Sequence, residues 1–438
     1  MHGVREIVRH EGGVAVVLAL VALLPLTALV VVLLTMSAFE PQIASNLAAT
    51  NQAQYLAEAG IEAAFDALAS TVNWSAVLAG PPAATCTVGV VAPGTVQGAV
   101  LPGLSASAGT YTVRVRNDCF SNARSNPSSD SALTGVPLDA SATVDTNDRL
   151  ILTSTGTIGT AMRTNTVVIR KVSFPPIRAA LAFPGVGANV DFSGSFAIRG
   201  VDTNQDGTNG PGSAVLGLAV GVVANEADIE IALQNNPQTS VEGKSQVDPA
   251  TTTRGPDTVA FDAALTSQAV IDFVNAVRQT ADIKIAAGAR GFSIRNIGSA
   301  CDFQGNGIDC WGTDSRPKVV YVKGSSDERV AALDVSGTSM GSGLLIVEDG
   351  TVALTGDFRW NGPVILSGRN VGIRYYGGGN RDIYGAVVVN ETRSDGPPNL
   401  EADMSGTATL SYSTQALANA MTAVGNRRLM TLYNWQDQ

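Results

Sequence analysis

The chain has 438 residues, 45% of them hydrophobic and only 15% charged, against about 25% charged in an average soluble protein. Its length predicts two or three domains. The formal net charge of −10 excludes wholesale nucleic-acid binding, which needs clustered Lys and Arg to neutralise phosphates. Both histidines, His2 and His10, precede Glu11. Because the rest of the chain lacks imidazole, Ser-His-Asp, Cys-His and histidine–metal chemistry are excluded from its body.

A long apolar segment follows the N-terminus. No residue from 12 to 39 carries a formal charge, and as a helix this segment exceeds the ~30 Å hydrocarbon core of a bilayer. Arg5 and Arg9 precede it, and no basic residue follows until well into the chain. Positive-inside bias therefore predicts a cytoplasmic leader over 1–11, a transmembrane span over about 13–36, and the bulk of the chain outside the cytoplasm.

The helical pattern continues beyond this span. Residues 40–70 are rich in good helix formers, and their apolar side chains recur at roughly helical spacing. This expected stripe consists of Phe39, Ile43, Leu47, Tyr55, Ile61, Phe65 and Leu68. Together the two halves predict one long helix over 12–72, apolar first and amphipathic later.

Several motifs in this segment resemble those of a known family. They are Arg9-His10-Glu11-Gly12-Gly13, then Glu40-Pro41-Gln42-Ile43, and then Ala57-Glu58-Ala59-Gly60-Ile61-Glu62. Over about residues 5–70 the chain is similar to the N-terminal segment of PilX-type minor pilins, which are accessory subunits of type IV pili.

The resemblance implies a non-enzymatic pilus subunit. Such a subunit is held in the inner membrane by one span, with its C-terminal bulk in the periplasm, and becomes extracellular after assembly. Its implied partners are other minor and major pilins, a tip-associated PilY-like adhesin, and a prepilin peptidase that cuts after Gly12 or Gly13. Major pilins carry Glu at the fifth mature position, where this chain has Val17 or Leu18. That departure resembles minor pilins at a fibre tip, which prime assembly or display a head for adhesion.

Residues 76–173 are typical of a small antiparallel β domain. β-branched alternation predicts strands over 110–116, 149–155 and 164–170. A long helix packed on such a sheet is the pilin architecture, and Pro175-Pro176 marks the expected end of this domain.

The four cysteines are Cys86, Cys119, Cys301 and Cys310, and they allow three pairings. Proximity along the chain favours Cys86–Cys119 and Cys301–Cys310 in an oxidising compartment.

An internal repeat indicates the architecture of the C-terminal half. Residues 189–200 and 351–362 share the pattern V-x-(F/L)-(S/T)-G-(S/D)-F-x-(I/W)-x-G, and a looser copy lies at 402–412. Short apolar strands also recur about every twenty residues between Gly-rich turns, as stacked rungs require. The pattern predicts a β-solenoid head, resembling a parallel β-helix, over 177–438 with a helical insertion at about 264–282. A β-sandwich is the alternative.

Two further elements are expected near the C-terminus, a terminal capping helix over 413–423 and a last strand over 429–435. The expected fold class is therefore α+β, with a long pilin-like helix, a small antiparallel β domain and a β-helix-like head.

One turn resembles a calcium loop. Asp202, Asn204 and Asp206, followed by Gly207, match the first half of an EF-hand loop, D-x-N-x-D-G. Position twelve is Ser213, so the bidentate Glu of that loop is missing. The two interpretations are a Ca²⁺ site completed by backbone carbonyls and an Asn/Asp-rich surface turn, and no other cofactor is expected.

The sequence offers two enzyme interpretations. Ser339 lies in a G-x-S-x-G motif, but a serine nucleophile needs a base and no histidine is available. Carboxylates alone serve glycan-cleaving enzymes, and Asp349, Asp357 and Asp382 lie near the expected rungs. The function favoured by the sequence is a minor pilin-like subunit. The alternatives are a large minor pseudopilin of a type II secretion system and a membrane-anchored β-helix enzyme acting on glycans.

Overall fold

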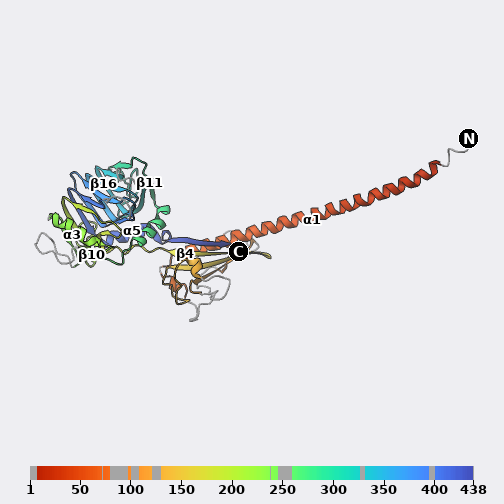
Figure 1. Ribbon diagram of the computed structural model, residues 1–438, viewed down its shortest axis with the longest axis horizontal. Helices are drawn as coiled ribbons and strands as arrows, with labels where there is room; N and C mark the ends of the chain where they lie inside the picture. The colour runs from red at the N-terminus through yellow and green to blue at the C-terminus, as the bar shows by residue number, and fades with distance from the viewer. Residues whose placement is uncertain are drawn as a thin grey trace. The chain divides into compact units, whose positions relative to one another are not determined.

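A computed structural model describes residues 7–71, 73–78, 97–99, 108–120, 130–236, 238–244, 259–325, 331–393 and 400–437. The chain divides into two compact units, which are described separately below. The helix unit comprises residues 1–170 and 432–438, and the head comprises residues 171–431 (Figure 1).

The helix unit is built on α1 (Ile7–Ala69), a single helix of 63 residues. Ala and Leu, which favour helix, dominate it, and the helix continues through Pro25 and Pro41 (Figure 1). Within the described chain, the part of α1 from Val14 onward is the one helix long and apolar enough to cross a membrane, with a mean hydropathy of 3.0 in its most apolar window. The predicted long N-terminal apolar helix is confirmed.

The second part of the helix unit is a five-stranded sheet. Its strands, in spatial order, are β1 (Gln97–Ala99), β2 (Thr110–Asn117), β3 (Arg149–Ile158), β4 (Ala161–Lys171) and β22 (Met430–Asp437). The pairs from β1 to β4 are antiparallel, which confirms the predicted antiparallel sheet. Two short helical turns accompany it, η1 (Trp74–Ala76) and α2 (Asp130–Thr134).

The last strand of the chain corrects the expected domain boundary. β22 pairs with β4 in the antiparallel sheet, so the head is an insertion between two neighbouring strands of the helix unit. The expected head over 177–438 assigned this strand to the wrong unit. Local sequence predicts that a strand forms but not which sheet it joins, because pairing partners are distant in the chain.

Small side chains bring α1 against the sheet. A Cβ on Gly156 of β3 would lie 2.0 Å from the backbone oxygen of Ala53, and one on Gly60 would lie 2.3 Å from Ser154 Oγ. Both positions therefore require glycine for the close approach. The buried stripe of the helix is Ala53, Leu56, Ala57, Gly60, Ile61, Ala64 and Leu68.

This stripe differs from the expected one. Ile61 and Leu68 are buried as expected, whereas Phe39, Ile43, Leu47 and Tyr55 are exposed. Alanine and glycine carry little apolar signal, so the sequence pattern followed the larger side chains instead.

The head contains two parallel sheets, and from β11 to β21 successive strands alternate between them. The larger sheet runs in the order β10 (Val259–Phe261), β8 (Leu216–Val220), β5 (Ala179–Phe183), β19 (Arg381–Glu391), β17 (Asp357–Gly368), β15 (Thr338–Glu348), β13 (Lys318–Lys323) and β11 (Ile283–Ala286). A branch from β19 continues through β21 (Thr407–Tyr412), β7 (Ser195–Arg199) and β9 (Ser240–Glu242). The second sheet runs β12 (Phe292–Arg295), β14 (Ala331–Ser336), β16 (Thr351–Thr355), β18 (Gly372–Tyr376), β20 (Ala402–Met404) and β6 (Val190–Phe192).

The strands of each sheet are in register, so that like residues form columns. One column of aliphatic side chains crosses the eight strands from β10 to β11 in the larger sheet, namely Val259, Leu218, Leu181, Val387, Val364, Leu345, Val320 and Ile283. Phe192 and Leu354, which are equivalent in the sequence repeat, fall in a single column of the second sheet. The repeat is therefore a repeat of structure.

The order of the strands in the head differs from their order along the chain. The first strands, β5 to β7, stack on the last ones, β19 to β21, and β8 to β10 extend the stack beyond them. The chain then returns at β11, on the opposite edge of the larger sheet. The chain therefore enters and leaves the head at adjacent places, and the amide of Val172 donates to the carbonyl of Leu429.

Three helices accompany the sheets, α3 (Asn225–Asn235), α4 (Ser267–Val277) and α5 (Thr414–Arg428). The helix α4, followed by a 3₁₀ turn over Arg278–Thr280, lies where a helical insertion was expected. The expected capping helix is also present as α5. It does not close an end of the stack, however, because it lies across β13, β15, β17 and β19.

Candidate functional site

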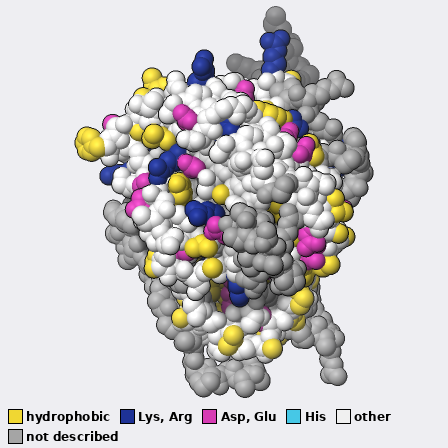
Figure 2. Space-filling view, turned by 90° about the vertical axis from the view of Figure 1, so that its left-hand side faces the viewer, with side chains coloured by type: hydrophobic (Ala, Val, Ile, Leu, Met, Phe, Trp, Pro, Cys, Tyr) yellow, Lys and Arg dark blue, Asp and Glu magenta, His cyan; other side chains and the backbone are white. Residues whose placement is uncertain are grey.

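The exposed apolar half of α1 is the most distinctive surface of the helix unit. Large apolar side chains from Val14 to Leu47 are exposed on every side of the helix, and Leu24 is 70% exposed. Soluble monomers rarely leave continuous apolar patches larger than a few hundred Å² in water. Figure 2 shows the molecule from the left-hand side of Figure 1. On that face hydrophobic side chains are scattered and basic and acidic groups are interspersed, unlike on the apolar half of α1. This half of α1 therefore needs a lipid or protein environment.

The predicted processing positions lie at the start of this surface. Gly12 and Gly13 are within α1, one turn after its first residue, Ile7. Cleavage after either glycine stays a prediction.

The predicted calcium turn has its carboxylates engaged by protein groups. Asp202 is buried, and its carboxylate accepts hydrogen bonds from the backbone amides of Gly212 (2.6 Å) and Thr414 (2.8 Å) at the start of α5. Asp206 is exposed, and hydrogen bonds from the Thr208 hydroxyl and amide lower its pKa. Asn204 donates to Thr208 Oγ1 and to the carbonyl of Asn209.

The structure thus gives each of the three residues a role in the turn or at the helix start. In the described part of the chain, no three acidic, His or Cys side chains are grouped in a way that could hold a metal. Calcium binding at this turn stays a prediction, and calorimetric titration tests it.

The disulfide prediction is confirmed for one pair. Cys301 and Cys310 are bonded, with their Cα atoms 5.1 Å apart. Cys119 is also disulfide-bonded, and Cys86 lies outside the described residues.

Three of the four residues considered for enzymatic roles, Ser339, Asp349 and Asp357, have structural hydrogen bonds. Ser339 is buried, its hydroxyl donates to the carbonyl of Ser336, and the amide of Ile297 donates to it. Asp349 accepts from the amide of Arg369, and Asp357 accepts from the amide of Asn380. Asp382 lies within β19. These bonds fix the turns between strands.

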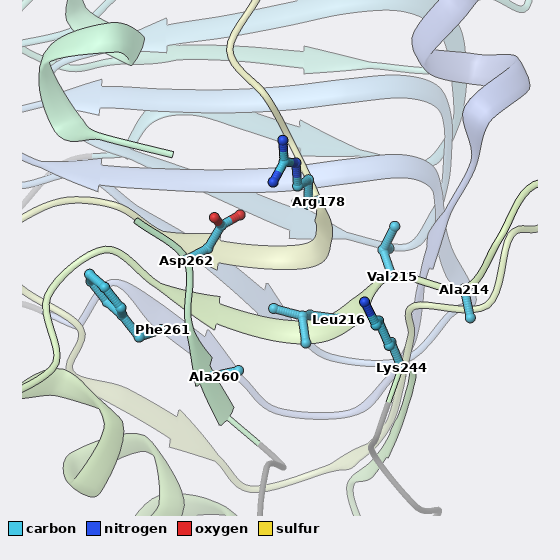
Figure 3. Close-up of a pocket in the computed structure, with 8 residues that line it drawn as sticks. All are labelled: Arg178, Ala214, Val215, Leu216, Lys244, Ala260, Phe261 and Asp262. Carbon is cyan, nitrogen blue, oxygen red and sulfur yellow. The ribbon is translucent and has the colours of Figure 1, made fainter. Parts of the chain in front are cut away.

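A cavity of about 360 Å³ lies at the β8–β10 edge of the head. Figure 3 shows Arg178 and Asp262 beside one part of this cavity, with Lys244 near Val215 in another part. Arg178 and Lys244 are exposed, and Asp262 already accepts from the amide of Ala264. The charges therefore face solvent rather than an enclosed ligand.

Two carboxyl groups are buried where the first and last strands of the head meet. Glu401 is 1% exposed, and its Oε2 accepts from the amide of Asn189 at 2.6 Å. Glu391 is also buried, and both side chains flank Gly187, where a Cβ would lie 2.8 Å from Glu401 Oε1. Burial raises the pKa of Glu401 to about 7, a rise that the charge of Glu391 reinforces, and burial also raises the pKa of Glu391.

We expect the head to lose stability as the pH rises from about 5 to about 8. The folded-state pKa of Glu401 lies above the ordinary value of 4.5, so folded protein keeps a proton that unfolded protein has released. The contribution of Glu401 to the free energy of unfolding is complete below about pH 4.5 and is lost as the pH rises through about 7. The total loss is up to about 3 kcal/mol. Thermal unfolding across this range measures the loss.

Glu401→Gln should flatten this dependence, because a neutral amide occupies the same site at every pH. The control is Glu230→Gln in α3. An equally steep pH dependence in Glu401→Gln would contradict the assignment to Glu401.

No protein-family model matches the chain, and no curated protein is significantly similar to it. Among solved structures, the chain is similar to the competence-associated pilin ComZ from Thermus thermophilus. The identity is 12% and the TM-score 0.21, over 89% of this chain and 97% of that chain.

The sequence pattern missed the residues that let the helix meet the sheet. Gly60 and Gly156 each interrupt a pattern in which a side chain would pack, one in a helix and one in a strand. An isolated glycine in such a place is the available signal, since it often marks a close approach of backbones.

Proposed function

We propose that the chain is a non-enzymatic, minor pilin-like subunit of a type IV pilus, anchored in the inner membrane before assembly. The observation that carries this proposal is the division of α1. Its second half is packed on an antiparallel sheet of the same unit, and the large side chains of its apolar first half are exposed. Such a helix can lie in a bilayer before assembly and can pack against other apolar helices after it.

The head suits display rather than catalysis. Its in-register columns support stacked coils, which we propose form a β-helix-like solenoid. The acids and the serine considered for chemistry hold turns or lie within strands. In this proposal the head primes pilus assembly or presents a surface for adhesion. Other minor and major pilins and a PilY-like tip adhesin are its proposed partners.

Filament shearing tests the proposal. Leu47 and Tyr55 are exposed on α1, the latter 68% exposed, so charges there leave the helix–sheet contact intact. We expect the wild-type chain in filaments sheared from the cell surface. The variant Leu47→Asp/Tyr55→Asp should remain in the membrane fraction, because its helix can no longer pack against apolar neighbours.

The matched control is Asn51→Asp, an exposed polar position between the two substitutions. It should enter filaments as the wild type does. A chain that is abundant in membranes but absent from filaments in piliated cells would contradict the pilus role.

A further inference from the structure

A cavity of about 500 Å³ lies between β6, the last strand of the second sheet, and the helix α3. Val190 and Asp191 of β6 line it on one side, and Asp228 and Ile231 of α3 line it on the other. Both aspartates are exposed, so the cavity is accessible from solvent. We call it the β6–α3 groove.

The helix α3 divides its side chains between the core and this groove. Ile229 and Leu233 are buried and hold the helix on the head. Asp228 and Ile231 are three positions apart, so they share another face of the helix, and Ile231 is 56% exposed. The groove therefore has one wall that combines a carboxylate with an apolar contact surface.

The other wall contains backbone groups at a free edge of the sheet. Alternate residues of a strand bond the same neighbour in a parallel ladder, and the backbones of Asn189 and Ser193 bond β20. Val190 and Phe192 therefore direct their N–H and C=O groups away from β20, toward α3. The carbonyl of Phe192 accepts from Asn236 Nδ2 at the end of α3. Among the described residues, no group bonds the outward N–H and C=O of Val190.

The charges that line the groove are all negative. Asp191 and Asp228 are its charged side chains, and neither has a hydrogen bond or an ion pair with a described residue. Asp191 lies directly opposite Asp403 of β20, and the basic residue of that column, Arg374, lies beyond Asp403 on β18. Like charges opposite each other on neighbouring strands are unfavourable, so a cation supplied at the edge of β6 would be stabilising.

An extended basic peptide matches this combination of groups. Peptides that add a strand to a sheet edge gain affinity from main-chain hydrogen bonds and specificity from alternate side chains. The open backbone of Val190 supplies such an edge, and the two carboxylates call for Lys or Arg. A metal ion fits less well, because no three acidic, His or Cys side chains of the described chain are grouped to hold one. An acidic ligand would be repelled.

We infer that the β6–α3 groove binds an extended basic segment of a partner protein, which pairs with β6 at Val190. A Lys or Arg of this segment lies beside Asp191 and Asp228, and an apolar side chain contacts Ile231. The groove belongs to the head, so the inference goes beyond the proposed function and does not depend on α1. Membrane anchoring and filament incorporation test the proposed function separately.

Fluorescence anisotropy with the full chain in an uncharged detergent tests the inference. The probe is a short, end-blocked, labelled peptide of alternating valine and lysine. We expect it to bind with a dissociation constant below about 1 mM, and more weakly as salt is added, because salt screens exposed charges. Three comparison ligands are the same peptide with glutamate in place of lysine, the same peptide N-methylated at its central residues, and spermidine.

Asp191→Asn and Asp228→Asn remove the two charges with little change of shape. Both positions are exposed, so we expect both variants to fold. Each should weaken binding by about three-fold, and the double variant by about ten-fold. The matched control is Glu230→Gln, which removes a carboxylate of α3 that does not line the groove, and it should bind as the wild type does.

The comparison ligands separate the parts of the inference. The glutamate peptide and the N-methylated peptide should each bind at least about ten-fold more weakly, because one lacks the cations and the other cannot donate backbone hydrogen bonds. Spermidine as tight as the lysine peptide would mean a site for cations only and would overturn the inference. Unchanged affinity in the double variant, or no peptide binding at about 1 mM, would overturn it as well.

Discussion

Gly156→Val should separate α1 from its sheet. The new Cβ would lie 2.0 Å from Ala53 O and 2.6 Å from Ala57 N, both backbone atoms that cannot rotate away. Valine favours strands, so the backbone of β3 itself gains by the change. Any loss therefore reports the helix contact. We expect destabilisation of the helix unit by about 3 kcal/mol, the upper end for overpacked cores.

Scanning calorimetry of the full chain in detergent measures this effect. A loss of that size lowers the melting temperature of a unit of about 180 residues by roughly 6–12 °C. Gly159→Asn is the control, since nothing lies within 4 Å of that position and Asn tolerates its φ of +55°. If Gly156→Val melts like the control, the close helix–sheet contact is wrong.

Two arginines in the exposed half of α1 should release the chain from the membrane. Leu24 and Val31 lie near the middle of the apolar stretch. Each replacement by Arg costs about 3–4 kcal/mol of insertion free energy, so the pair costs about 6–8 kcal/mol. This cost approaches the whole insertion free energy that a stretch of about twenty apolar residues gains in a bilayer. We expect Leu24→Arg/Val31→Arg to lose most of its membrane-bound fraction.

Carbonate extraction and flotation measure the bound fraction. Asn51→Arg/Gln52→Arg adds the same charge at exposed positions beyond the stretch, and it should remain membrane-bound. A wild-type chain recovered free of membrane before any filament forms would contradict anchoring by α1.

The sequence predicted those features of the fold that are local in the chain. The uncharged apolar run and the helix-forming residues after it located α1, and alternation located the strands around residues 110–116, 149–155 and 164–170, because burial of one face of a strand imprints a regular pattern. The repeat identified Phe192 and Leu354 as equivalent, and they share a column. Cys301 and Cys310 paired as expected, since only eight residues separate them.

Features that join distant parts of the chain were beyond sequence reasoning. The pairing of β22 with β4 and the stacking of the last strands of the head on its first have no local signal. The hydrogen bond between Asn361 and Asp314 was missed for the same reason, because the two residues are 47 positions apart. The sequence around Glu401 does not indicate that its side chain is buried, and this burial is the main reason why its pKa is raised.

The inserted position of the head has a mechanical consequence. Two covalent tethers, at Lys171 and Thr431, connect it to adjacent strands of one sheet. A tensile load on the head is therefore shared between two backbone segments. A protease that cuts one of these segments leaves the head attached by the other. Two connections of this kind keep the head attached to the helix unit under mechanical load.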